Sequence, residues 1–255
     1  LKKGLHEYSY GAGFIREDLG DKNFSYGDPV FMSLHNYGFS DSLKAGYALE
    51  LKDGLFNAGP AAVILAPVVG GAVDAAFSMS KSEGESGYGG RLGYVFRSSR
   101  FNAALSFGAF SENFSNVSTK PFDDKAEFQW NAGLGYGGWK EFGSVSFELS
   151  GSKMHSGRDT FRQAASYNRS ITRSVAFFAR MSSIETDGDK SQEVFAGIHA
   201  YLGKEFSASA SYSKLENDTV RKVGVQKNLP LGTGFGFRAE EEAHDEYTNR
   251  TADVR

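Results

Sequence analysis

Apolar and polar residues alternate without a break between residues 206 and 213. The even positions are Phe206, Ala208, Ala210 and Tyr212, and every odd position from 207 to 213 is a serine. Successive side chains of an extended strand point to opposite sides of a sheet, so this segment predicts a strand with one apolar and one polar face. Two folds accommodate such a strand: a soluble β-sandwich that hides the apolar face in its core, and a membrane barrel that turns it to lipid.

The same alternation recurs along the chain and predicts an all-β fold. The chain has 31 glycines and 14% aromatic residues but only 5 prolines, which suits a long run of strands better than helices. The apolar stretch 58–77 contains Pro60 and Pro67, which favours two strands over a membrane helix. About fifteen strands are expected, over residues 5–16, 29–39, 43–52, 56–66, 70–80, 87–97, 101–111, 125–137, 143–152, 160–168, 174–184, 192–202, 205–213, 219–229 and 233–243.

The connections between these strands are expected to sort by length. Tight turns are expected around 40–41, 66–67, 98–99, 141–142, 169–173, 203–204 and 230–233. Longer polar loops are expected over 17–28, 80–86, 111–125, 152–159, 185–191 and 214–219. The link 52–57 is short and fits this series of long loops least well. The tight turns then follow even-numbered strands and the long loops odd-numbered ones. This sorting is typical of an outer-membrane barrel with short periplasmic turns and long external loops, whereas a Greek-key sandwich has no reason for it.

The predicted fold is therefore an antiparallel up-and-down transmembrane β-barrel, of which this chain forms a large part with about 15–16 strands. Strands near ten residues long also match what a tilted strand needs to cross the hydrocarbon layer. The residues expected to face lipid are Val194, Ala196, Ile198, Phe206, Ala208 and Ala210. Those expected to face a watery lumen are Glu148, His199, Ser207, Ser209 and Ser211.

The sequence carries no motif for a catalytic, cofactor-binding or metal site, and a protein that is not an enzyme is expected. A net charge of −3 does not favour nucleic acid as a partner, and the absence of cysteine excludes disulfides and thiolate zinc sites within this chain. The five histidines lack the HExxH spacing, and no G-x-S-x-G sequence occurs. The glycine clusters 87–94, 131–139 and 231–238 do not end in G-K-[ST], as a phosphate loop would.

The acidic run 240–246 lacks the alternating oxygen ligands of a calcium loop, so a solvated strand end or external loop is expected there. An enzyme that uses a lumenal serine with His199 remains an alternative, because such chemistry needs only spatial adjacency.

The first fifty residues are more specific. Leu1, Lys2 and Gly4 open the chain, Tyr8-Ser9-Tyr10 follows, and then come Gly13, Phe14 and Arg16. This order resembles the segment that follows the plug domain in fimbrial outer-membrane ushers. The segments 24–29 and 37–51 also resemble that family, as do 87–114 and 227–238 in less distinctive ways.

The resemblance implies an outer-membrane protein of a Gram-negative bacterium that belongs to the chaperone–usher pathway. Ushers receive pilus subunits from a periplasmic chaperone and pass the growing pilus through a barrel of twenty-four strands. This chain would then be one segment, 1–255, from about the seventh strand to about the twenty-second. The plug and the N-terminal and C-terminal periplasmic domains would lie outside it, and both ends are expected to continue into further sequence. The implied partners are pilus subunits, the chaperone and outer-membrane lipid, with no cofactor.

Two further alternatives stay open beside the enzyme. A self-contained porin-like channel needs no more than fifteen or sixteen strands. A soluble β-sandwich adhesin or binding module also satisfies the alternation, since its apolar faces meet in a core.

Overall fold

The structure is a computed structural model of the chain, and it describes residues 2–16, 24–66, 70–139, 142–203, 205–216, 218–229 and 233–254. Parts of the expected connections 17–28, 66–67, 141–142, 203–204, 214–219 and 230–233 lie outside the described residues. Within the described residues, no helix has the length and hydropathy of a membrane span.

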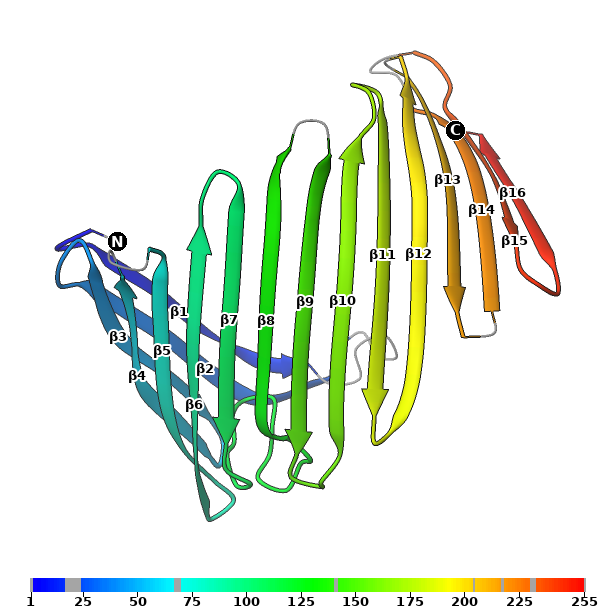
Figure 1. Ribbon diagram of the computed structural model, residues 1–255. Coiled ribbons are helices and arrows are strands. Elements are labelled where there is room, and N and C mark those ends of the chain that lie inside the picture. The colour runs from blue at the N-terminus through cyan, green and yellow to red at the C-terminus, as the bar shows by residue number, and fades with distance from the viewer. Residues whose placement is uncertain are drawn as a thin grey trace. The chain divides into compact units, whose positions relative to one another are not determined.

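Among the described residues, the regular elements are sixteen β-strands (Figure 1). They are β1 (His6–Arg16), β2 (Tyr26–Gly38), β3 (Leu43–Lys52), β4 (Leu55–Leu65), β5 (Ala72–Ser82), β6 (Glu85–Arg97), β7 (Phe101–Phe110), β8 (Ala126–Trp139), β9 (Gly143–Met154), β10 (Asp159–Ser170), β11 (Val175–Thr186), β12 (Asp189–Leu202), β13 (Phe206–Leu215), β14 (Asp218–Lys227), β15 (Phe237–Ala243) and β16 (Thr248–Val254).

The order of the strands in the sheet is their order in the chain, from β1 to β16. The registers of β1 to β6 and of β10 to β16 show antiparallel pairing of each strand with its sequence neighbours. This is an up-and-down arrangement without crossovers, so the predicted all-β antiparallel fold is confirmed. The fifteen expected spans ended at 243, and β16 follows them, within the predicted total of 15–16 strands.

The chain divides into two compact units, which are described separately. The first unit comprises Leu1–Arg97, Ala103–Ala132 and Ser150–Asp159, and the second comprises Ser98–Asn102, Gly133–Leu149 and Thr160–Arg255. The first unit therefore contains β1 to β6, and the second contains β11 to β16.

Register in the second unit keeps the apolar and polar positions of neighbouring strands on separate faces. Ile198 of β12 pairs with Ala210 of β13, which in turn pairs with Val223 of β14. One residue along, His199 pairs with Ser209, and Ser209 pairs with Gly224. Because side chains alternate across a strand, the six residues predicted to share an apolar face do so, and Ser207, Ser209, Ser211 and His199 lie on the opposite face.

The predicted sorting of connections by length is wrong. The connections 53–54, 83–84, 187–188 and 216–217 follow odd-numbered strands yet contain only two residues each, whereas 228–236 follows an even-numbered one. Glu83 and Gly84 have φ of 53° and 87°, and Asp187 and Gly188 have φ of 52° and 91°. Two consecutive positive φ values define the tight hairpin turn that an acidic residue followed by glycine favours. The polar residues around these turns belong to the strand ends rather than to long loops.

Neither face of the sheet forms a conventional core. Only Leu55, Phe114 and Ala164 are buried hydrophobic residues among those that the structure describes. Large apolar side chains are exposed instead, for example Met181 (60%), Val223 (57%) and Phe147 (56%). Asn57, Ser80 and Ser182 are buried polar residues. In β14 the apolar Val223 and Val225 are exposed while the polar Lys222 is half-buried, which is the reverse of a soluble strand.

A polar face as the candidate functional site

The candidate functional site is the polar face of the sheet. Each of the two units has such a face. In the second unit this face carries Glu148 on β9, Ser166 on β10, Arg180 and Ser182 on β11, Glu193 and His199 on β12, Ser207, Ser209 and Ser211 on β13, Lys222 on β14, and Glu240 and Glu242 on β15. All five residues predicted to face a lumen therefore lie on it. Its side chains are held by strands, so their positions follow from the register.

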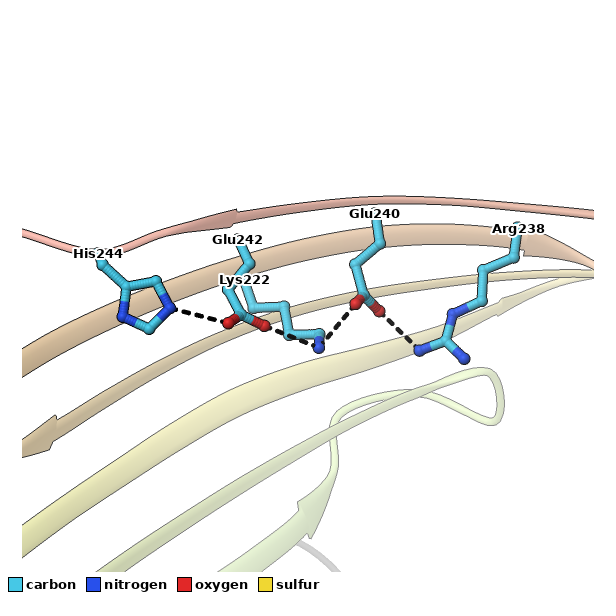
Figure 2. A network of polar contacts seen from close by, with 5 residues as sticks. All are labelled: Lys222, Arg238, Glu240, Glu242 and His244. Carbon is cyan, nitrogen blue, oxygen red and sulfur yellow. Dashed lines mark hydrogen bonds and ion pairs between the residues drawn. The ribbon is translucent and has the colours of Figure 1, made fainter. Parts of the chain in front are cut away.

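A ladder of alternating charges crosses β14 and β15 on this face (Figure 2). The Lys222 ammonium lies 2.7 Å from a carboxylate oxygen of Glu240 and 3.1 Å from one of Glu242. Arg238 donates to the other oxygen of Glu240 at 2.6 Å, and His244 contacts Glu242 at 2.8 Å. These pairs are partly exposed to solvent, so each contributes little to stability. Their main effect is to keep positive and negative groups together on a hydrated surface.

The run 240–246 lies at a strand end, which is one of the two expectations for it. Glu240, Glu241 and Glu242 belong to β15, which ends at Ala243, and a bend follows at 245–246. Glu240 and Glu242 point to the polar face, where Lys222 and Arg238 supply the compensating charge. The i, i+2 spacing of the two glutamates was the signal in the sequence, and it is the spacing of one strand face.

Further polar pairs line the rest of this face. Glu148 accepts a hydrogen bond from Arg180 at 3.1 Å. The hydroxyls of Ser146 and Ser166 are 2.6 Å apart. His199 lies opposite Ser209 in the register, and its ring packs edge-on against Tyr201 with centroids 4.5 Å apart. The face is thus rich in hydroxyls and compensated charges.

The first unit has a polar face of the same kind. Lys44 donates to Glu7 at 2.5 Å, and Arg91 donates to Asp74 at 3.1 Å. Asn57 donates to Glu50 at 3.3 Å and accepts a hydrogen bond from Ser78. The register places all of these side chains on one side of β1 to β6.

The connection 111–125 folds onto the polar face of the first unit. The Ser115 amide donates to the Ser80 hydroxyl at 2.9 Å, and the Val117 amide donates to Glu50 at 3.0 Å. Ser115 is fully buried, and Phe114 is only 7% exposed. The loop backbone approaches β6 so closely that a Cβ at Gly87 would overlap the Phe114 amide. The sequence predicted a long loop here. It did not predict that the loop packs in a fixed position against β3, β5 and β6.

Lys125 holds this loop together from within. Its ammonium donates to the backbone carbonyl oxygens of Glu112, Phe114, Lys120 and Pro121, at distances between 2.7 and 2.8 Å. Burial lowers the pKa of Lys125, and the charges of Asp123 and Glu112 oppose that shift. Nothing in the local sequence distinguishes this lysine from a solvated one, so sequence reasoning missed it.

The opposite face of the first unit is rich in aromatic residues and includes a histidine pair. Nδ1 of His6 lies 3.0 Å from Nε2 of His35, whose Nδ1 lies 2.6 Å from the Tyr10 hydroxyl. The rings of Tyr8 and Tyr10 stack beside them, and His35 stacks on Tyr47. His6 and His35 are 29 residues apart in the sequence, and the antiparallel register of β1 and β2 brings them together. No group of three or more metal-ligating side chains was found among the described residues.

Comparison with known proteins was informative only at the level of structure. No protein-family model matches the chain, and no curated protein sequence matches it either. The translocation pore of the P pilus usher (PapC) is similar over 100% of this chain and 54% of its own, with a TM-score of 0.66 and 17% identity. A P pilus tip assembly intermediate from E. coli, PapC-PapD-PapK-PapG, is similar over 100% of this chain and 34% of the other, with a TM-score of 0.77 and 17% identity.

A bacterial polysaccharide outer membrane secretin is also similar, over 98% of this chain and 95% of its own, with a TM-score of 0.51 and 11% identity. These neighbours are channel and transport proteins rather than enzymes. The chain spans about half the length of the first usher pore that it matches. Over that span, it has the fold of the translocation pore of the P pilus usher.

Proposed function

We propose that this chain forms part of the wall of an outer-membrane usher channel, through which chaperone-delivered pilus subunits are assembled and secreted. The supporting observation is that all of its strands, in unbroken up-and-down order, match usher translocation pores over the full length of the chain. The usher-like residues between 1 and 51 point the same way. In this proposal the chain is a single barrel segment without catalytic activity, and its partners are subunits and the chaperone bound elsewhere on the usher.

The two faces of the sheet take different solvents in this proposal. The apolar face, which includes Val194, Ala196, Ile198, Phe206, Ala208 and Ala210, contacts lipid. The polar face, which includes Glu148, His199, Ser207, Ser209 and Ser211, lines the lumen. On β12 the apolar positions run from Val194 to Leu202, which is roughly 26 Å along the strand at 3.3 Å per residue. Strands of a transmembrane barrel are tilted by about 35–45°, so this length spans roughly 20 Å of an apolar band that is about 25 Å tall.

The lumen wall would act by being polar, hydrated and self-compensated. A folded subunit that slides along it meets hydroxyls and ion pairs whose charges are already satisfied, as in the ladder of Figure 2. Such a surface offers neither an extended apolar patch nor a strong field of one sign, and these are the features that make proteins adhere. The loop 111–125 adds a fixed layer to the polar face of the first unit.

The test is the intact mass of the native protein, captured from an outer-membrane fraction with an antibody against this segment. We expect a mass several times the 27.7 kDa of this chain, with peptides from additional soluble domains on both sides. A native protein of about the size of this chain would contradict the usher proposal.

A second candidate is a self-contained porin-like outer-membrane channel. The observation that favours it is the match with the polysaccharide secretin, where the overlap covers nearly all of both chains. This candidate predicts single-channel conductance from the segment alone in planar bilayers. It also predicts that deletion of the gene leaves pilus assembly unchanged, whereas the usher proposal predicts loss of pili.

A further inference from the structure

We propose that Lys214 and Arg221 form a binding site for the phosphate group of a membrane lipid headgroup, at one end of the β13–β14 hairpin. The inference rests on the proposed function, because it requires the apolar face to contact lipid. The site is composed of two neighbouring cations and a tyrosine at the edge of the apolar band.

The register brings the two cations together. Lys214 pairs with Thr219, and Tyr212 pairs with Arg221, so Lys214 and Arg221 are diagonal neighbours on the same face of β13 and β14. Diagonal side chains in an antiparallel pair are about 7–8 Å apart at the backbone, within the reach of two long side chains that converge on one anion. Tyr212 lies between them, beside Arg221.

The pair lies where the apolar band ends. Below it on the same face, β13 presents Phe206, Ala208 and Ala210, and β14 presents Val223 and Val225. Above it, β13 ends at Leu215 and β14 begins at Asp218. Lysine, arginine and tyrosine at this level are suited to the boundary between acyl chains and headgroups, because their stems and rings are apolar and their ends are polar. Lipid phosphates lie at this boundary.

The two cations also lack the partners that neighbouring charges have. Arg250 on the same face lies 2.7 Å from a Glu241 oxygen, and Lys227 at the other end of β14 lies 3.8 Å from Glu205. Lys214 and Arg221 are exposed, and neither makes an ion pair with any residue that the structure describes. An exposed cation in water needs no partner. Two adjacent ones at a membrane surface attract an anion with matching hydrogen-bond acceptors.

Phosphate fits this chemistry. Arginine donates two parallel hydrogen bonds to phosphate oxygens, and lysine adds a point charge. A phosphate monoester carries up to two negative charges at neutral pH, which balances one lysine and one arginine. The ligand would then be a membrane lipid whose headgroup carries a phosphate monoester.

The test uses the full-length protein that carries this segment, placed in phosphatidylcholine nanodiscs and titrated with diphosphoryl lipid A. We expect Lys214→Gln/Arg221→Gln to bind this lipid at least about tenfold more weakly, because charge-assisted hydrogen bonds are lost. Dephosphorylated lipid A should bind the unchanged protein as weakly as it binds the double variant. Arg169→Gln is the matched control, an isolated cation at the opposite strand end that pairs with Phe177, and should leave binding unchanged.

The outcomes separate this proposal from the proposed function. This segment has no cysteine. With any cysteines elsewhere in the full-length protein replaced, a fluorophore on Val223→Cys can report whether spin-labelled lipid quenches it. No quenching would overturn the lipid-facing assignment and this proposal with it. Quenching together with equal affinity of the double variant would overturn the phosphate site alone. Equal binding of the dephosphorylated lipid, or binding of inorganic phosphate at the pair in detergent, would also overturn it.

Discussion

Single residues on these strands are distinguished chiefly by the side of the sheet from which they project. Ala210 and Ser209 are adjacent in β13, yet Ala210 lies between Ile198 and Val223, whereas Ser209 lies between His199 and Gly224. In the proposed orientation, the same substitution therefore meets lipid at Ala210 and the watery lumen at Ser209.

Lysine at Ala210 should impair folding into bilayers, while lysine at Ser209 should be tolerated. In the proposed orientation Ala210→Lys places a cation near the middle of the apolar band, at a cost of roughly 2–4 kcal/mol. Urea titrations of folding into lipid vesicles would measure the difference between the two variants. The opposite order, with Ser209→Lys the more damaging change, would mean that the faces are inverted.

His244 should make the stability of its surroundings depend on pH. The hydrogen bond to Glu242 raises the pKa of His244 from its ordinary value of 6.5, and the charge of Asp218, whose carboxylate lies 3.6 Å from the ring, acts in the same direction. Asp245 and Tyr247 are close by, the first bonded to the Thr219 amide and the second stacked on the imidazole. A raised pKa in the folded state means that the stabilisation is complete below the unfolded value and is lost as the pH rises through the folded value.

Thermal or urea unfolding of the unchanged protein and of His244→Gln should therefore differ most near about pH 5.5 and converge toward about pH 8.5. NMR titration of the His244 ring gives the pKa directly. A difference that grows with pH, or a ring pKa below 6.5, would contradict the role assigned to Glu242 and Asp218.

Among the elements, the loop 111–125 differs most from what its local sequence indicates. Its attachment depends on Glu50 and Ser80, which are far away in the chain, and on Lys125, whose ammonium satisfies four backbone carbonyls. The loop is therefore organised by tertiary contacts rather than by turn motifs.

Lys125→Met should release this loop without unfolding the strands beneath it. The substitution keeps an aliphatic stem but leaves buried carbonyl oxygens without donors, a cost of at least about 1–3 kcal/mol. Limited proteolysis should then cleave between 111 and 125 faster than in the unchanged protein. Lys120→Met is the matched control, since Lys120 is exposed. Equal cleavage rates in the two variants would contradict the role of the Lys125 ammonium.

At this scale, alternation predicted the strands well and the connections poorly. Where an apolar band crosses a strand, as in 206–213, polarity reports the face directly. Beyond the band both faces are polar, so the strand ends around Glu83-Gly84 and Asp187-Gly188 were mistaken for loops. The polar face itself was predicted from serines, but the charge ladder of Lys222, Glu240 and Glu242 depends on register across two strands. No local pattern contains that register.

At the scale of the whole molecule, the part of the chain that the structure describes lacks the buried apolar interior on which soluble domains depend. Exposed side chains such as Met79 (62%), Met181 (60%) and Val223 (57%) leave a broad hydrophobic surface uncovered. The burial of such surface drives folding and association in water, so a protein that exposes it needs another apolar phase.

Removal of detergent from the purified protein should therefore cause aggregation. Light scattering during detergent dialysis would follow this, with transfer into lipid nanodiscs as the control that keeps the protein dispersed. A monodisperse monomer in detergent-free buffer would instead support the soluble β-sandwich alternative.

The unbroken order from β1 to β16 also bears on how such a wall can change over evolution. Each hairpin pairs only with the hairpins before and after it, so one can be duplicated or deleted without rerouting the rest of the chain. A lineage can then widen or narrow such a barrel in steps of two strands, since barrel diameter grows with strand number. In the proposed function, the number of repeated hairpins would therefore set the size of the pilus subunits that the channel can pass.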